Sequence, residues 1–345
     1  MERRVSLADR YLFMRQLHVL QRAGVPLLSS LGALEAQLPA GALKQTIQAI
    51  SHDLLNGSGL SQAFARHPRS FHPLVISLLR IGEAGGLLEQ MLKRLAELCE
   101  WELELQSRLK QALFYPLIVL GVLAVGVLLM VTVVLPQFVH LFASWQLSLP
   151  WPTRLLLGVS LIVTRFGWLL ALLGLAGVFA LGAYLRTEAG RLRWHTLKLR
   201  LPLVGPLFVQ LAMARFARAM AALTASGVPV LETLALSGES VNNSYIQREL
   251  RQVQERVKGG ARLAQALGHD GLFPPAVLQM VATGEETGHM DELLQSIADY
   301  YDQQAAYVLR TLVTAIEPAL LIVVGVGVLV MASARKQDIK RFPLG

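Results

Sequence analysis

The sequence predicts an all-α membrane protein with two tandem repeated six-helix cytoplasmic bundles and three transmembrane helices. Three observations predict this fold class. A segment near the N-terminus recurs in the second half of the chain, long apolar runs lack charged residues, and basic residues are distributed unevenly around those runs.

The repeat is clearest between residues 13–31, FMRQLHVLQRAGVPLLSSL, and residues 216–234, FARAMAALTASGVPVLETL. The matched positions keep one register, pairing Phe13 with Phe216, Arg15 with Arg218, Leu20 with Leu223, Gly24 with Gly227, Pro26 with Pro229 and Leu28 with Leu231. A self-match at fixed spacing is typical of a duplicated structural unit. We refer to the two halves as copy one and copy two.

The match continues, after a slip of one position, to the end of each copy. Phe71, Pro73, Gly82, Glu83, Gly86, Leu88 and Leu92 fall on Phe273, Pro275, Gly284, Glu285, Gly288, Met290 and Leu294. Pro116 then falls on Pro318, at the start of an apolar run in both copies. Each copy is therefore expected to hold roughly a hundred residues of helical domain followed by a membrane span.

Glycine and proline divide each copy into short helices. Apolar residues spaced three and four apart predict an amphipathic helix over residues 6–23. Gly24 is suited to cap that helix and Pro26 to open the next one, and Gly227 and Pro229 repeat this device. Further glycine-rich breaks predict about six helices in each copy.

The sixth helix of each copy is predicted to run without a breaker into the apolar segment that follows it. No flexible linker intervenes, so a force on the bundle would reach the span. We expect Pro116 and Pro318 in a first helical turn after a kink, where proline costs little.

The apolar fraction is 53% with only 16% charged residues, and three runs account for it. They predict transmembrane helices at residues 116–136, 166–185 and 312–334, each long enough to cross about 30 Å of hydrocarbon. The N-terminus lacks the pattern of a cleavable signal. We therefore expect the first span to direct insertion.

The formal net charge is +8, and its distribution favours a membrane orientation over nucleic-acid binding. Residues 136–153 carry no formal charge, whereas a basic cluster follows the second span, namely Arg186, Arg191, Arg193, Lys198 and Arg200. Basic loops stay on the cytoplasmic side. This places residues 1–115 and 186–311 in the cytoplasm and residues 137–165, a loop and helix, in the periplasm. Trp145 and Trp151 would anchor that loop at the interface, and residues 335–345 form a basic tail.

The chain offers little for catalysis. Cys99 is the single cysteine, and the eight histidines do not lie at metal-binding spacing. His289 and Asp291 lie close in sequence but suit a solvated helix start. The glycine-rich segments at 57–59 and 325–327 lack the pattern of a phosphate loop. We expect no enzyme activity, cofactor or metal, so energy would come from a partner.

The candidate functional residues are turn motifs and exposed carboxylates. Glu83, Glu285 and Glu286 lie in glycine-flanked turns, where a carboxylate either stabilises the start of the next helix or contacts a partner. Glu97, Glu100 and Glu104 make the sixth helix of copy one acidic. Glu104 and Arg108 would form a solvated i, i+4 pair, and the alternative is that this face meets a basic partner.

Glu317 is the one carboxylate expected near the depth of the bilayer. Ionisable groups there are costly and are functional candidates. It either guides an apolar helix of a partner or lies at the interface, as Tyr115 does at the matching position of copy one.

These residues resemble the inner-membrane platform proteins of type II secretion and type IV pilus assembly, the F-protein or PilC family. The motifs that carry the resemblance are Phe13, Arg15-Gln16-Leu17, Gly24-Val25-Pro26-Leu27, Gly82-Glu83, Arg215-Phe216, Ser226-Gly227-Val228-Pro229, Phe273-Pro274-Pro275, Gly284-Glu285-Glu286-Thr287-Gly288 and Glu317-Pro318. LPWPTR and LPLVGP, between the domains, are also similar to family signatures. The resemblance runs from about Leu7 to about Val330.

The resemblance implies a non-enzymatic, oligomeric platform in the bacterial inner membrane. It would couple a hexameric assembly ATPase to pilin or pseudopilin subunits and contact other inner-membrane assembly proteins. We expect this sequence to depart from the family pattern in two places, namely the short segment that usually precedes the first repeat and the basic C-terminal tail ARKQDIKRFPLG. The alternative function is a small-solute transporter or channel subunit, which the scarcity of polar residues in the spans disfavours.

Overall fold

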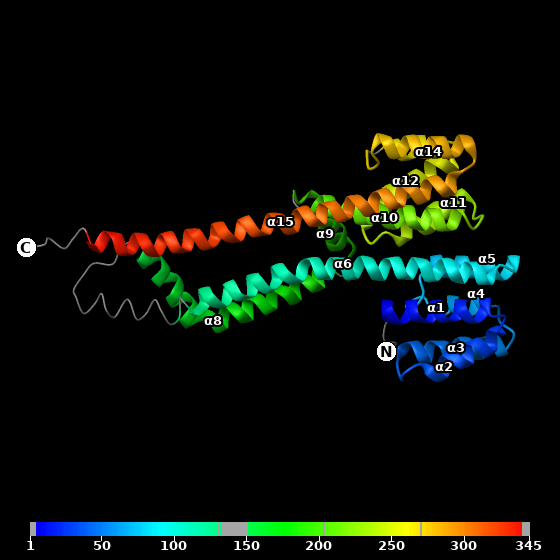
Figure 1. Ribbon diagram of the computed structural model, residues 1–345, viewed down its shortest axis with the longest axis horizontal. Helices are drawn as coiled ribbons and strands as arrows, with labels where there is room; N and C mark the ends of the chain where they lie inside the picture. The colour runs from blue at the N-terminus through cyan, green and yellow to red at the C-terminus, as the bar shows by residue number, and fades with distance from the viewer. Residues whose placement is uncertain are drawn as a thin grey trace, which may run out of the picture. The chain divides into compact units, whose positions relative to one another are not determined.

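The computed structural model describes residues 5–129, 132, 151–185, 187–202, 204–269 and 271–339 (Figure 1). All regular secondary structure in these residues is helical, which confirms the predicted all-α class. The predicted anchor Trp145, residues 137–150 of the predicted periplasmic loop and the end of the basic tail lie outside the described residues.

The helices follow the sequence repeat. Copy one contains α1 (Leu7–Arg22), α2 (Leu27–Gln37), α3 (Ala42–Leu55), α4 (Leu60–Ala65), α5 (Pro73–Gly85) and α6 (Leu88–Leu129). Two helices follow, α8 (Trp151–Tyr184) and α9 (Glu188–Arg200). Copy two contains α10 (Gly205–Thr224), α11 (Val230–Ser240), α12 (Ser244–Lys258), α13 (Leu263–Gly268), α14 (Pro275–Thr287) and α15 (Met290–Ile339).

The chain divides into two compact units, which we describe separately. The first unit comprises residues 1–108 and 195–307, and so holds the helical domains of both copies. The second comprises residues 109–194 and 308–345, which include the apolar part of α6, all of α8 and the later part of α15.

Each copy has its own hydrophobic core inside the first unit. Phe13, Leu17 and Leu78 are fully buried in the core of copy one, and Phe216 and Met220 are buried in that of copy two. The core of copy one also takes in Ala219, Leu223 and Val228 from α10 and the turn after it. The two copies therefore pack directly against each other.

The predicted helical hairpins at the start of each copy are present. Gly24 and Gly227 end α1 and α10 with φ angles of 76° and 77°. Val25 N–H donates to Leu20 O, as Val228 N–H does to Leu223 O, both at 3.1 Å. The left-handed conformation at these positions strains any residue with a Cβ. Pro26 and Pro229 then stand immediately before α2 and α11.

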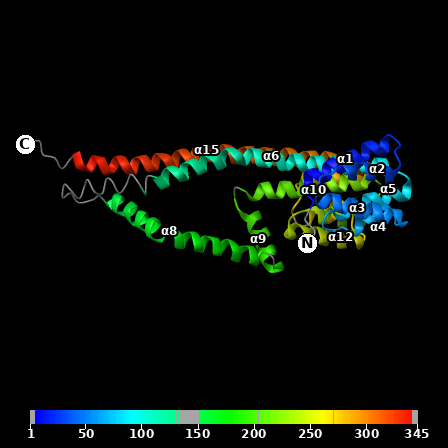
Figure 2. The ribbon, with the colours of Figure 1, turned by 90° about the horizontal axis from the view of Figure 1, so that it is seen from below.

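The sixth helices are longer than a bundle helix needs to be, as predicted. The helix α6 runs for 42 residues and α15 for 50 (Figure 2). Pro116 and Pro318 lie inside these helices, so the expected first turn after a kink is wrong. Proline removes one backbone hydrogen bond there, and the residues on both sides remain helical.

Two helices of the described residues are long and apolar enough to cross a membrane. Within the segment Leu88–Gly126 of α6, the most apolar stretch has a mean hydropathy of 1.7, and only 6% of that stretch is buried. The other, α10, is 61% buried and so has the character of a core helix. The segment Leu88–Gly126 therefore contains the start of the predicted 116–136 span. The predicted spans at 166–185 and 312–334 stay predictions.

The helix α8 begins earlier than the predicted second span. Pro152 lies in its first turn, where its missing N–H removes no helical hydrogen bond, so residues 151–154 of the LPWPTR segment are helical. The described part of the predicted 137–165 loop is thus helical from Trp151 onward.

Candidate functional site

The Gly82-Glu83 motif holds three helices of copy one together. A Cβ at Gly82 would lie 2.9 Å from Met91 Cγ and 3.0 Å from Leu88 Cα, so only glycine lets α5 approach the start of α6 this closely. Glu83 points toward α4 instead. Its Oε1 accepts from Leu60 N–H at 2.6 Å, and its Oε2 accepts from Ser61 N–H at 3.1 Å and from Ser61 Oγ at 2.7 Å.

The Gly284-Glu285 motif does the same in copy two. Glu285 accepts from Leu263 N–H at 2.6 Å and from Ala264 N–H at 3.0 Å, at the start of α13. A Cβ at Gly284 would meet Met290 Cα at 3.2 Å. The equivalent glutamates thus cap equivalent short helices. Neither α4 nor α13 has a capping side chain of its own, so the glutamate supplies acceptors for otherwise unpaired N–H groups.

This geometry corrects part of the sequence-based expectation. The glutamates were expected near the start of the helix that follows them, yet they stabilise the start of a helix that precedes them in the chain. Local sequence could not show this, because the contact forms only when α5 packs against α4. Glu286, beside the cap, points elsewhere and lies 3.6 Å from Arg262 with both side chains exposed.

The cap also sets the protonation of Glu83. Partial burial raises the pKa of the carboxyl, but the hydrogen bonds from the Ser61 side chain and from the Ser61 and Leu60 N–H groups outweigh it. The net effect lowers the pKa below its ordinary value of 4.5. The charged form, which accepts all three bonds, is therefore favoured at neutral pH.

The acidic residues predicted on the sixth helix of copy one are exposed on α6 and have local partners. Glu104 pairs with Arg108 at 3.0 Å, as predicted, and Glu97 lies 3.9 Å from Lys93. Glu100 accepts from Tyr11 Oη at 2.8 Å. Arg15 Nη1 in turn donates to Tyr11 Oη at 2.9 Å, which gives the predicted residue Arg15 a place on the same surface.

Glu102, next to this acidic face, turns inward and joins the two copies. Arg215 on α10 donates from Nε to Glu102 Oε2 at 3.0 Å and from Nη2 to Oε1 at 2.9 Å. The side chains are only 17% and 22% exposed. A two-bond pair that is largely screened from water is geometrically specific and costly to break on one side only.

Trp101 makes a second link between α6 and copy two. Its Nε1 donates to Asp302 Oδ2 at 2.8 Å, and the Arg218 guanidinium lies 5.5 Å from the centre of its ring. Arg218, a predicted site residue, also pairs with Asp299 at 3.0 Å and with Asp302. The indole therefore lies against an Arg–Asp cluster of copy two.

We call the contact region between the two copies, which includes the Glu102–Arg215 pair and the Trp101–Asp302 hydrogen bond, the junction. Two further contacts complete it. Arg94 Nη1 donates to Ala222 O at 2.9 Å and to Ser226 Oγ at 2.7 Å. His72 begins α5 by accepting from Leu74 N–H through Nδ1, so its Nε2–H donates to Glu239 O of α11 at 3.3 Å. Burial lowers the pKa of His72, in keeping with this neutral form.

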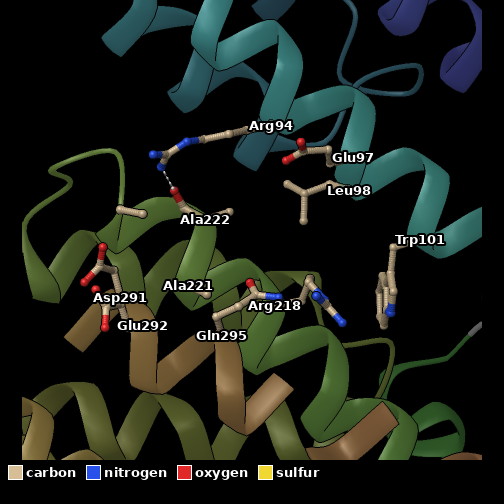
Figure 3. A pocket seen from close by; sticks show the side chains of 11 residues that line it. Arg94, Glu97, Leu98, Trp101, Arg218, Ala221, Ala222, Asp291, Glu292 and Gln295 are labelled. Atoms are coloured by element: carbon tan, nitrogen blue, oxygen red, sulfur yellow. Dashed lines mark hydrogen bonds between the residues drawn. The ribbon is translucent and has the colours of Figure 1, made fainter. Parts of the chain in front are cut away.

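A cleft of about 540 Å³ lies along the junction. Figure 3 shows Arg94 and Trp101 extending from α6 on either side of Leu98, with Arg218 beneath and Asp291, Glu292 and Gln295 on α15. Nearby, burial raises the pKa of the Cys99 thiol to about 11, which leaves it a poor nucleophile at neutral pH. Among the residues that the structure describes, no three His, Cys, Asp or Glu side chains gather as a metal site would require.

The remaining predicted site residues lie in the hairpin turns and in α15, and the Gly227 turn borders the junction, because Ser226 and Val228 on either side of it contact copy one. Gly24, Pro26, Gly227 and Pro229 form the hairpin turns described above. Glu317 and Pro318 lie on the backbone of α15 in the second unit.

Most of the junction was not predictable from the sequence: Arg94, Trp101 and Glu102 were not among the candidate residues, and Arg215 appeared only in a resemblance motif, without a partner. One signal was present: a lone tryptophan in a helix otherwise rich in glutamate has an apolar surface that must be covered. The charged pair had no such signal, because Glu102 and Arg215 are distant in sequence and look like ordinary surface residues.

Comparison with known proteins gives a consistent result. The family profile described as "Type II secretion system (T2SS), protein F" matches residues 13–136 and again residues 216–334. It thus matches each copy of the repeat separately, from the first hairpin to the apolar segment.

Curated relatives match nearly the whole chain. A type IV pilus assembly protein PilC of Thermus thermophilus is 37% identical over 328 residues, which cover 94% of this chain and 80% of the relative. A type II secretion system protein F of Aeromonas hydrophila is 34% identical over 322 residues, covering 93% and 82%. A protein F of Pseudomonas aeruginosa is 34% identical over 332 residues, covering 96% and 82%.

Proposed function

Since this chain belongs to the type II secretion system protein F family, we propose that it is an inner-membrane platform protein of a type IV pilus or type II secretion machine. In this role it would have no enzymatic activity of its own. It would couple a cytoplasmic assembly ATPase to the extraction and polymerisation of pilin-like subunits.

One observation carries the proposal beyond family membership. In each copy the helix that completes a buried core continues without interruption into an apolar segment, as α6 and α15 do. Leu92 and Leu294 are buried core residues near the start of these helices. A helix has no flexible joint comparable to a glycine- or serine-rich linker, so displacement of a core would move the segment attached to it.

The detailed topology belongs to this proposal. It has two tandem six-helix bundles in the cytoplasm, three transmembrane helices and a cytoplasmic N-terminus. The basic cluster after α8 supports that orientation. The 116–136 run, whose start is apolar and exposed, supports the first of the three spans. We also propose that the chain forms homo-oligomers and contacts other inner-membrane assembly proteins.

The acidic surface of α6 is the proposed contact for a basic partner. Glu97, Glu100 and Glu104 are all exposed, and their present partners are weak surface pairs or a tyrosine hydroxyl. Replacing the three by lysine should therefore leave the fold intact while abolishing assembly. Normal assembly by that variant would show that the acidic surface of α6 is not the contact for a basic partner.

Crosslinking in native membranes tests the proposed role directly. Mass spectrometry of proteins crosslinked to a tagged chain should recover a hexameric ATPase and pilin-like subunits. Recovery of self-crosslinks alone would contradict the platform role, and solute flux would then be the next measurement.

An insertion tests the coupling. Four residues of alternating Gly and Ser placed after Arg108 would interrupt α6 just beyond the end of the first unit. We expect loss of pilus or pseudopilus assembly with normal amounts of the protein in the membrane. The matched control carries the same insertion after Asn56, in the exposed turn between α3 and α4, and should keep assembly. Equal activity of the two insertions would contradict helical coupling.

A further inference from the structure

The contact between the two copies uses a different surface on each copy. Copy two contributes α10 and α11, through Arg215, Ala222, Ser226 and Glu239, and it adds Asp302 of α15, which accepts from Trp101. Copy one contributes α5 and α6, through His72, Arg94, Trp101 and Glu102. We call these the α10–α11 face and the α5–α6 face.

Because the copies share one fold, each of these faces has an equivalent on the other copy. The equivalent of the α10–α11 face is the α1–α2 face of copy one, where Leu12, Val19 and Ala23 replace Arg215, Ala222 and Ser226. The equivalent of the α5–α6 face is the α14–α15 face of copy two. There Ser296, Tyr300, Gln303 and Gln304 replace Arg94, Leu98, Trp101 and Glu102.

These two equivalent faces are exposed. Leu12 is 50% exposed and Val19 is 57% exposed, one above the other on α1. On the other face Tyr300 is 37% exposed, and Ser296 and Gln303 are exposed beside it. Their counterparts Ala222, Arg94 and Trp101 are all partly covered by the other copy.

We infer that a second copy of this chain binds here, the α1–α2 face of one chain docking on the α14–α15 face of another in the manner of the internal contact. The internal contact is heterologous, so it leaves one unused face of each kind on the chain. Such a contact repeats from chain to chain and closes into a ring or continues as a strand. This inference gives a surface to the self-association proposed above.

The residue differences fit this partner. The charged pair Arg215–Glu102 corresponds to Leu12 and Gln304, so both charges are absent together. Likewise Arg94 and Ser226 correspond to Ser296 and Ala23. Burying a charge without its partner is the main cost of a mismatched interface. Docking the exposed faces would bury no such charge at these positions. It would instead bring Leu12 and Val19 against the α14–α15 face.

One part of the internal contact has no equivalent. Gln303 stands where Trp101 packs against Arg218, so the contact between chains would lack an aromatic side chain at its centre. Aromatic anchors supply much of the energy of an interface. The contact between chains should consequently be weaker than the one between copies, and open to disruption by single substitutions.

Disulfide trapping in the full-length chain tests this inference. In a Cys99→Ala background, a chain with Val19→Cys is produced together with a differently tagged chain with Ser296→Cys, and membranes are oxidised. In the internal contact the Arg94 guanidinium reaches Ala222 O, so by analogy Ser296 and Val19 should lie within the length of one arginine side chain, a separation that motion of the helices closes during oxidation. We expect the mixed disulfide at roughly ten times the yield from Leu55→Cys and Ser296→Cys, since apposed residues have a high effective concentration. Leu55 is the matched control, at 71% exposed on α3.

Two results would overturn the inference. A mixed yield equal to that of the Leu55 control would show that the faces do not meet. A predominance of Val19→Cys homodisulfides would show that the chain pairs through identical faces.

A further variant tests the chemistry of the contact. Leu12→Glu in the Val19→Cys chain should reduce the mixed disulfide to the control yield, with an unchanged circular dichroism spectrum. Undiminished crosslinking would contradict apolar docking. These outcomes are read without reference to pilus or secretion activity, so they are independent of the proposed function.

Discussion

The interior of copy one is repeated in copy two, whereas the residues that form the junction between the copies are not repeated. Inside each copy, Gly82-Glu83 and Gly284-Glu285 occupy the same turn, allow the same close helix approach and cap the same short helix. At the junction, Glu102 and Arg215 have uncharged equivalents, Gln304 and Leu12. Features needed to fold either copy are kept in both, whereas features that join the copies appear once.

The largest effect should come from breaking the junction on one side. Arg215→Leu introduces the residue found at the equivalent position of copy one and leaves Glu102 largely covered without its partner. We expect a loss of about 3 kcal/mol in the free energy of unfolding, as for other buried pairs that lose one member. Denaturant unfolding in detergent micelles, followed by circular dichroism, measures it.

The double variant Arg215→Leu with Glu102→Gln is the control for that experiment. It carries the uncharged combination of the equivalent faces and leaves no lone charge, so it should recover most of the lost stability. Additive losses in the two single variants and the double variant would mean that the pair is not coupled. Glu104→Gln, which breaks an exposed pair on the same helix, should change stability by no more than about 0.5 kcal/mol.

An intermediate effect should distinguish the two glycines. Gly82→Ala places a Cβ 2.9 Å from Met91 Cγ and 3.0 Å from Leu88 Cα, whereas Gly284→Ala meets its nearest atoms at 3.2 Å. Overpacking costs about 1 to 3 kcal/mol, and replacing glycine by alanine in a helix returns about 1 kcal/mol. The net cost is therefore between about 0 and 2 kcal/mol, and the closer contacts at Gly82 favour the upper end for Gly82→Ala and the lower end for Gly284→Ala. Equal effects would show that both turns relax alike.

The features that each copy repeats were predictable from the sequence. The hairpin at Gly24 and Pro26, its counterpart at Gly227 and Pro229 and the long sixth helices all follow local chemistry, namely a left-handed cap, a fixed φ and an unbroken apolar pattern. These signals lie within a few residues of one another, and the duplication presents each of them twice.

Features that depend on packing were not predictable in the same way. Glu83 was expected to act on the following helix, because sequence distance gives no sign that α4, more than twenty residues earlier, folds back against it. Trp101 and Arg215 meet partners from the other copy, and a single occurrence offers no repeat to compare. The junction residues differ between the two copies, so comparing the repeats could not predict them.

The smallest effect should come from the glutamate caps. Glu83→Gln keeps the size of the side chain but removes the charge that accepts three hydrogen bonds, while Glu285→Gln removes a cap with two. Losing a helix cap costs about 1 kcal/mol, so we expect a loss near that value for Glu83→Gln and a smaller one for Glu285→Gln.

The pH dependence separates the Glu83 cap from a simple packing effect. The pKa of Glu83 is lowered in the folded chain from its ordinary value of 4.5, so the unfolded chain binds more protons over that range. The stabilisation is complete above about pH 4.5 and is lost as the pH falls through the lowered pKa. The stability difference between the native chain and Glu83→Gln should accordingly shrink as the pH is lowered from 7 toward that range, because both chains then carry an uncharged side chain. A difference that stays constant with pH would assign the effect to shape and not to charge, and would weaken the link between the shared Gly-Glu motif and helix capping.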